Sequence, residues 1–177
     1  MRWVQALVCY FAFSFCSPLY AADSQDIAGY VMHVQMTPAA CAFDSSRQKQ
    51  RKCLEGYSLT IASLLPEVPV GRDCDTKTSA KLTPLQAKVV ARVMPDENAR
   101  VQLWQNVGGC VPMNASQYFR TVINFAERLK VPADLTSPNT IEVQKENLRQ
   151  QFTKLNPSLP PNGIRFTCQS SKFDSIL

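Results

Sequence analysis

The cysteines constrain this chain more than any other feature of its sequence. Five of them follow an apolar leader, at Cys41, Cys53, Cys74, Cys110 and Cys168. In an oxidising compartment such cysteines form disulfides, and because five is an odd number, one thiol is left over within the chain. The sequence has no C-x-x-C pair, and its one histidine has no cysteine at zinc-ligand spacing. We therefore expect no metal and no cofactor.

Residues 1–22 have the features of a secretory signal peptide. Arg2 provides the positive start, an apolar run extends to Cys16, and small residues then predict cleavage after Ala21 or Ala22. The run is shorter than the roughly 20 apolar residues of a membrane span. We expect a bacterial type of exported protein, periplasmic or secreted, with no membrane span once the leader is removed.

Residues 23–177 are predicted to form one domain. The full chain has 45% hydrophobic and 19% charged residues, which is an ordinary globular composition. It has a net charge of +5, which falls to +4 when Arg2 leaves with the leader. This mild positive charge is compatible with an anionic partner but does not require one. We expect a monomer.

Strand formers gather in three short segments of this domain. They predict strands over residues 29–36, 57–65 and 164–168, the last of them after a turn at residues 160–163. The polar, basic segment 45–52 is predicted to be a loop between the first two strands. These strands do not alternate regularly with the predicted helices, so we favour an α+β fold.

Three helices are predicted from start signals and apolar spacing. Thr83-Pro84 is a helix start, and Pro95 is expected to end that helix. A second helix is predicted over residues 116–130 with Asn114 at its start, and a third from about Thr140 to Asn156. We expect their apolar faces to contain Leu85, Val89 and Val93, then Tyr118, Val122, Phe125, Ala126 and Leu129, then Ile141, Leu148, Phe152 and Leu155.

Two short motifs and their order along the chain carry a family resemblance. The motifs are LTIASLLP at residues 59–66 and LWQNVGGC at residues 103–110. The other pieces are Tyr30–Met32 and Thr37-Pro38 before Cys41, the helix ending in Met94-Pro95, Tyr118-Phe119, and Arg165–Cys168. With these pieces the chain resembles the ribonuclease T2 family, and within it the bacterial periplasmic ribonuclease I-like branch, over residues 29–177.

The resemblance implies a central, mainly antiparallel sheet with flanking helices. It also implies two disulfides, Cys41–Cys53 and Cys74–Cys110. In the family, a further strand follows the position of Cys168 and supplies that cysteine with a partner, whereas here the sequence stops at residues 173–177. We therefore expect an unpaired Cys168 and a domain that is truncated at its C-terminus and lacks the last strand.

The scaffold residues of the two motifs match the family better than the catalytic ones do. Active members read L-T-[IV]-H-G-L-W-P in the first motif and E-[WY]-x-K-H-G-x-C in the second. The histidine, glycine and tryptophan of the first motif and the glutamate, lysine and histidine of the second are replaced by Ala62, Ser63, Leu65, Leu103, Asn106 and Val107. The residues that remain are Leu64, Pro66, Trp104, Gly108 and Cys110.

These replacements remove the chemistry that the resemblance implies. Such endoribonucleases activate a ribose 2′-hydroxyl and release a 2′,3′-cyclic phosphate, which needs one group to take a proton and another to give one. A lost acid or base costs roughly 10²–10⁴ in rate, and a lost charge stabiliser roughly 10²–10³, although such losses are not additive. We predict a catalytically inactive member, a pseudoenzyme, with no catalytic residues.

Three other functions stay open at this point. The resemblance places Gln35 where some members hold a base, and His33 falls on the same side of the first strand. His33 could therefore line the cleft of a weak endoribonuclease with an altered site, or be an ordinary edge or surface histidine. The basic residues Arg47, Lys49, Arg51 and Lys52 could retain RNA or nucleotide binding, or form an ordinary solvated loop. The apolar replacements, from Ala62 and Leu65 to Leu103 and Val107, could form a docking surface for a periplasmic protein or have collapsed into the core. A decaying gene with no retained role is a further interpretation.

Overall fold

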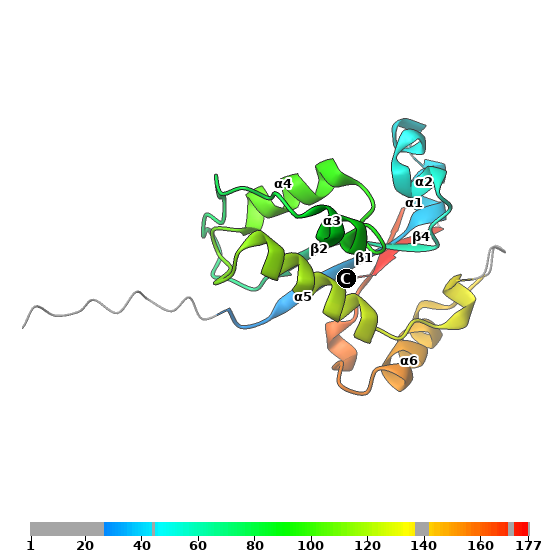
Figure 1. Ribbon diagram of the computed structural model, residues 1–177. Helices are drawn as coiled ribbons and strands as arrows, with labels where there is room; N and C mark the ends of the chain where they lie inside the picture. Colours follow the sequence, from blue (N-terminus) through cyan, green and yellow to red (C-terminus); the bar gives the residue numbers. More distant parts are fainter. Residues whose placement is uncertain (1–26, 44, 137–141, 170–171, 177) are drawn as a thin grey trace, which may run out of the picture.

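The structure, a computed structural model, describes residues 27–43, 45–136, 142–169 and 172–176. These residues have the predicted α+β architecture, with one antiparallel sheet and helices around it (Figure 1). The strand order in the sheet is β2-β1-β4-β3. The strands are β1 (Tyr30–Met36), β2 (Leu59–Pro66), β3 (Phe166–Gln169) and β4 (Lys172–Ile176).

The pairing of β1 with β2 contains a bulge that sets which side chains face the core. His33 pairs with Ser63 and Val34 pairs with Ile61, so that Ala62 is the extra residue on β2. Because of this extra residue, Ile61 and Leu64 both belong to the hydrophobic core although they are three residues apart. Without a bulge, residues at that spacing would point to opposite faces of the sheet.

Helices cover one half of the sheet and flank the other. Figure 1 shows α3, α4 and α5 gathered over β1 and β2, α1 and α2 near one end of β1, and α6 apart from α3 and α4. The helical segments are α1 (Thr37–Phe43), η1 (Ser45–Lys49), α2 (Arg51–Leu54), α3 (Pro84–Val90), α4 (Glu97–Val107), α5 (Ala115–Arg128), η2 (Ala133–Thr136), α6 (Lys145–Leu155) and η3 (Pro161–Gly163).

Two of the predicted helix starts are confirmed as capping boxes. The side chain of Thr83 accepts a hydrogen bond from the backbone N–H of Gln86, and the Gln86 side chain accepts one from the backbone N–H of Thr83. Asn114 and Gln117 make the same reciprocal pair at the start of α5. Each box satisfies two backbone donors that a helix start leaves without partners.

The first predicted helix ends earlier than Pro95, which corrects the prediction. After Val90 the chain tightens, because the N–H groups of Arg92 and Val93 donate to the carbonyls three residues earlier. This turn presents the Val93 carbonyl to the N–H of Ile61 at 2.8 Å. The predicted apolar face is also wrong in part, since Leu85 is 72% exposed and Val90 is the buried residue of α3.

Other segments differ from the sequence prediction. Segment 45–52 contains η1 and the start of α2 rather than a loop, and α4 was not predicted as an element. The expectation that no further strand follows Cys168 is wrong, because β4 follows β3 and pairs with both β1 and β3. The helix expected from Thr140 begins at Lys145, and Ile141 lies outside the described residues. Phe125 and Leu155 were expected inside, and they are partly exposed at the ends of their helices. The predicted signal peptide also lies outside the described residues.

One hydrophobic core joins the sheet to α3, α4, α5 and α6. Its most deeply buried large side chains are Leu64, Tyr118, Phe119, Val122 and Phe152. The sheet and the two long helices α4 and α5 therefore form one packed unit, and the two motifs lie inside it. Among the described residues, no helix has the length and apolar character needed to cross a membrane.

Candidate functional site

The fold brings the two sequence motifs together, because α4 packs directly on β2. The first motif forms β2, and most of the second forms α4 with the turn that follows it. Leu103 and Val107 are 8% and 2% exposed and belong to the same core cluster as Ile61 and Leu64. Leu103 and Val107 of α4 are therefore core residues and do not line an open cleft. Asn106, between them in sequence, is exposed.

The retained residues of the second motif have structural roles against segment 73–78. Trp104 is 3% exposed, and its Nε1–H donates to the carbonyl and to the Oγ1 of Thr78, both at 3.1 Å. Cys110 forms a disulfide with Cys74. Gly108 lies so close to Thr76 and Trp104 that a Cβ would collide with both. These contacts attach the irregular segment 73–78 to the end of α4.

The neighbouring Gly109 is also required by close packing. Its backbone N–H donates to the Cys74 carbonyl at 2.9 Å. A Cβ at this position would lie 2.6 Å from the carbonyl oxygen of Asp75 and 2.9 Å from that of Cys74. Two consecutive glycines therefore let the backbone of segment 73–76 lie directly against the turn after α4.

The first motif is held by the buried Tyr118 of α5. The Tyr118 hydroxyl donates to the Leu64 carbonyl at 2.6 Å, and both residues are 0% exposed. Burial raises the pKa of Tyr118 well above its ordinary value, so the hydroxyl stays neutral and donates across the neutral pH range. Sequence reasoning found Tyr118 as a core residue but did not find this hydrogen bond.

The remaining first-motif positions lie at the surface of the sheet. Ala62 and Ser63 are half-buried, whereas Leu65 is 45% exposed. His33 is the cross-strand partner of Ser63, next to the bulge at Ala62, and its Nε2 atom is buried. The structure thus brings the one histidine of the chain beside the position where the resemblance places a catalytic histidine.

The other predicted cleft residue, Gln35, contacts the basic segment. Its Oε1 accepts a hydrogen bond from the Lys52 ammonium at 2.8 Å. The disulfide Cys41–Cys53 joins α1 to α2 beside this contact, with the two Cα atoms 5.8 Å apart. Asp96 also holds α2, because its Oδ1 accepts from the backbone N–H of Arg51 at 3.0 Å. Sequence spacing gave no signal for either Lys52–Gln35 or Asp96–Arg51.

Both disulfides that the resemblance implies are present in the structure. Cys168 lies in β3 by its backbone, but its side chain is outside what the structure describes, as is that of Arg47. Within the described parts of the chain, no group of three or more His, Cys, Asp and Glu residues could hold a metal ion. The candidate site therefore contains β2, the outer face of β1, and α2.

The architecture is that of the ribonuclease T2 fold. The chain is similar to ribonuclease MC1 from the seeds of bitter gourd, a T2-family enzyme, with 14% identity and a TM-score of 0.57 over 83% of this chain and 85% of that one. A point mutant of ribonuclease MC1 in complex with 5′-UMP gives 15% identity and a TM-score of 0.55, over 83% and 84% of the two chains. Another mutant, in complex with 5′-GMP, gives 15% and 0.57, over 83% and 85%.

These similarities concern the fold, since the sequences have diverged far. No protein-family model matches the sequence, and no curated protein matches it either. The motif residues that the resemblance matches serve mainly in packing, hydrogen bonding or a disulfide, so they are consistent with a shared fold. At 14–15% identity the backbone arrangement is still similar although the sequences are not, so the likeness is found by comparing structures.

Proposed function

We propose that this protein is a ribonuclease T2-fold pseudoenzyme that binds RNA or nucleotides without cleaving them. The observation that supports the loss of cleavage is the burial of Leu103 and Val107 against β2. The resemblance places the glutamate and histidine of active members at these positions. In this chain they are aliphatic side chains inside the core, with neither a proton to transfer nor an open face toward a phosphate.

The replaced groups are ones that cleavage by this route cannot do without. A base must take the 2′-hydroxyl proton and an acid must protonate the leaving 5′-oxygen, and histidine suits both because its pKa lies near neutrality. Ala62 and Val107 offer no such group, and Asn106 offers hydrogen bonds but no charge. Each lost acid or base costs roughly 10²–10⁴ in rate, so even one loss is enough to suppress turnover.

RNA binding is supported by the surface around α2. Lys49 and Arg51 are exposed, and Lys52 reaches Gln35 on the outer face of β1. Such cations release counterions from a phosphate backbone when they bind it. The similar ribonuclease MC1 structures contain 5′-UMP and 5′-GMP, which makes a nucleotide the ligand of choice for this surface.

The same proposal places the protein outside the cytoplasm, in the periplasm or the medium. Two disulfides support an oxidising compartment, and the predicted signal peptide at residues 1–22 supports export. Periplasmic fractionation of cells expressing the full chain tests this part. The mature protein should appear in the periplasm or the medium with residues 1–21 or 1–22 removed, and retention of the full-length chain in the cytoplasm would contradict it.

The loss of cleavage is tested by incubating the purified mature protein with single-stranded RNA from about pH 4 to about pH 8. We expect no multiple-turnover cleavage at any pH. An active T2 ribonuclease serves as the positive control under the same conditions. Multiple-turnover cleavage that is abolished by His33→Ala would overturn the proposal and establish a weak endoribonuclease with an altered site, which is the function that the position of His33 beside Ala62 favours.

Binding is tested with the same RNA in a filter assay over a salt series. The double variant Lys49→Gln/Lys52→Gln should weaken binding and reduce the slope of log K against log salt by about 1.4, at about 0.7 per phosphate contact in a single strand. Lys81→Gln/Lys88→Gln, which removes two exposed lysines elsewhere, is the matched control. Absence of RNA and nucleotide binding by the unmodified protein at low salt would refute retained binding.

A protein-docking role for the apolar replacements has less support. Leu65 is exposed, but Leu103 and Val107 are core residues and offer no surface to a partner. Such a role needs a large exposed apolar patch. Of the residues predicted to form it, Leu65 has substantial exposure, whereas Leu103 and Val107 do not.

A further inference from the structure

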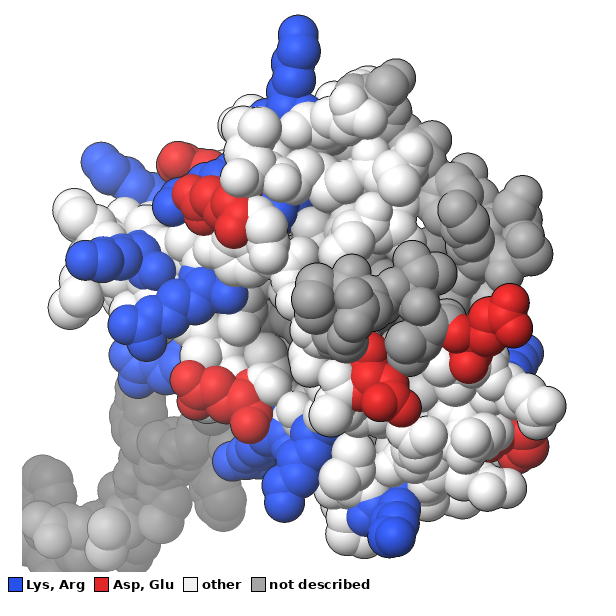
Figure 2. All heavy atoms as spheres, turned by 90° about the vertical axis from the view of Figure 1, so that its right-hand side faces the viewer, with Lys and Arg blue, Asp and Glu red and all other residues white. Residues whose placement is uncertain are grey.

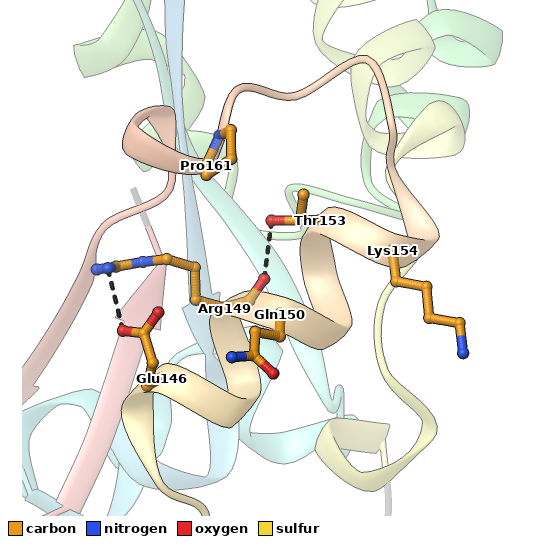
Figure 3. A pocket seen from close by; sticks show the side chains of 6 residues that line it. All are labelled: Glu146, Arg149, Gln150, Thr153, Lys154 and Pro161. Atoms are coloured by element: carbon orange, nitrogen blue, oxygen red, sulfur yellow. Dashed lines mark hydrogen bonds and ion pairs between the residues drawn. The ribbon is translucent and has the colours of Figure 1, made fainter.

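A hollow lined by polar residues and a proline lies on α6, away from the two motifs. Figure 3 shows it between α6 and the loop that carries Pro161. It has a volume of about 360 Å³ and is lined by Glu146, Arg149, Gln150, Thr153, Lys154 and Pro161. Figure 1 places α6 well apart from β2 and α2. The hollow is thus separate from the site built on β2 and α2.

The shape of this hollow follows from a turn that the sequence dictates. Asn156 ends α6, and its side-chain amide donates to the carbonyls of Lys130 and Phe152. The chain then folds back, with the N–H of Leu159 donating to the Asn156 carbonyl and that of Gly163 to the Pro160 carbonyl, both at 2.9 Å. This return places the Pro161 ring over α6 and gives the hollow a rigid apolar wall.

Arg149 is only partly used by the protein itself. One guanidinium nitrogen, Nη1, donates to Glu146 at 3.3 Å, and the side chain is 30% exposed. Its Nε is buried and has no hydrogen-bond partner among the described residues. A guanidinium has five N–H donors in a fork that matches phosphate oxygens. Because Nε is buried, a phosphate would approach Arg149 at the exposed end of its guanidinium, where Glu146 occupies Nη1.

The two cations of the hollow diverge instead of converging. In Figure 3, Arg149 extends to one side of α6 and Lys154 to the other, with Gln150 and Thr153 between them. Five residues separate the two cations, which is about 7.5 Å along a helix axis. This arrangement fits an extended chain of negative charges better than one compact ion.

On these grounds we infer that the α6 hollow is an accessory binding site for single-stranded RNA. Arg149 and Lys154 contact non-adjacent phosphates of one strand, and an unstacked base lies against the Pro161 ring and the Arg149 stem. Single strands are bound in this way elsewhere, by basic grooves combined with flat or apolar surfaces for the bases. The inference rests on the proposed RNA binding and gives it a second contact region outside the α2 surface.

Glu146 provides a second test, because its removal should raise RNA affinity whereas removal of the cations should lower it. Its carboxylate occupies one donor of Arg149 and repels a phosphate. Replacing it with glutamine should therefore tighten RNA binding, by about two- to threefold for a surface charge pair. A surface that binds RNA only through diffuse charge would not discriminate between Glu146 and another exposed acid such as Glu127.

The experiment is a filter-binding titration of single-stranded RNA over a salt series with the mature protein. Arg149→Gln/Lys154→Gln should weaken binding and lower the salt slope by about 1.4, for two phosphate contacts of about 0.7 each. Glu146→Gln should tighten binding. Lys88→Gln/Arg92→Gln, on α3 and in the turn after it, removes one lysine and one arginine away from the hollow. Glu127→Gln on α5 is the matched acid control, and circular dichroism verifies that each variant is folded.

The outcomes separate this site from the proposed function. The site is supported if the α6 pair weakens RNA binding, Glu146→Gln tightens it, and both controls change it little. If the unmodified protein binds RNA but the α6 and α3 pairs weaken it equally, or Glu146→Gln and Glu127→Gln act alike, the α6 site is refuted while RNA binding stands. If the unmodified protein binds no RNA at low salt, both are refuted.

Discussion

The two sides of α4 differ in what they keep of the T2 motifs. The side toward segment 73–78 and the turn after the helix keep Trp104, Gly108 and Cys110, each held by a hydrogen bond, a close backbone contact or a disulfide. The side toward β2 has the aliphatic residues Leu103 and Val107, and both are buried. One helix thus carries contacts that hold the backbone on one side and aliphatic core residues on the other, and a fold likeness does not by itself settle an activity.

The space on the β2 side has also been filled. A carboxylate and an imidazole facing a substrate need water or ligand around them, since burying a charge without a partner is costly. Aliphatic side chains at the same positions remove that requirement and extend the core from α4 to β2. Under the proposed loss of cleavage, the same two positions would account for both the missing groups and the extended core.

The largest expected effect is on the retained side, with Trp104→Ala. This substitution removes a 3%-exposed indole and its two bonds to Thr78, and such truncations cost about 3–5 kcal/mol. Urea unfolding of the oxidised mature protein measures the loss. Gln105→Ala, at an exposed position of the same helix, is the control and should change stability by less than about 0.5 kcal/mol. Equal effects of the two substitutions would remove the distinction between the sides of α4.

Val107→His tests the replaced side by restoring the residue type of active members. The position is 2% exposed, so we expect a loss of about 2–4 kcal/mol from overpacking and from burying a polar ring. Burial lowers the pKa of such an imidazole in the folded state, so the loss should grow as the pH falls below about 6.5.

Cleavage should not return with this substitution, alone or together with Ala62→His. The measurements are urea unfolding at about pH 8 and about pH 5.5 and the RNA cleavage assay. Val107→Ile, which changes size without polarity, is the matched control. If Val107→His leaves stability unchanged and cleaves RNA, the β2 side of α4 is an open active site and the comparison fails.

The sequence predicted the paired strands and α5 because their apolar spacing follows the geometry of those elements. It did not predict α4, since Arg100 stands among that helix's buried residues and interrupts its apolar face. The structure explains this arginine: Nη1 donates to the carbonyls of Met94 and Pro95, and burial lowers the pKa of the guanidinium. A buried cation satisfied by backbone carbonyls is a tertiary feature that helical spacing does not contain.

The sequence pointed to the residues of the candidate site but not to how they lie relative to one another. The motif comparison identified Ala62, Leu103 and Val107 as altered, yet it left open whether they form a cleft or core. That depends on the bulge at Ala62 and on how closely α4 lies on β2, and both are set by contacts distant in sequence. The contact of Lys52 with Gln35 likewise needed the fold, because the basic segment resembled a solvated loop.

A smaller effect is expected at Tyr118, which joins α5 to the first motif. Tyr118→Phe keeps the ring but leaves the Leu64 carbonyl without its donor, at a cost of about 1–2 kcal/mol. Because burial raises the folded-state pKa of Tyr118, its share of stability is present below the unfolded pKa near 10 and is lost as the pH rises above it. The difference between the two proteins should therefore shrink in alkaline urea titrations.

Tyr57→Phe provides the comparison for Tyr118. Its hydroxyl donates to the Ala91 carbonyl at 3.0 Å, but the residue is only half-buried, so water can replace the lost donor. A Tyr118→Phe effect no larger than that of Tyr57→Phe would show that the first motif does not depend on its buried hydrogen bond.

The smallest effect should come from Asn106→Lys, which returns the family's cation to the exposed edge of α4. The side chain points to solvent, so stability should change by less than about 0.5 kcal/mol. RNA binding should tighten only slightly, with a salt slope that increases by at most about 0.7. No cleavage should appear, because a charge stabiliser has no effect on a reaction that lacks its base and acid. The cleavage assay tests the comparison more strictly than any loss of stability. If Asn106→Lys alone yields turnover, then groups that move protons are present elsewhere in the site, and the buried face of α4 does not decide whether the protein cleaves RNA.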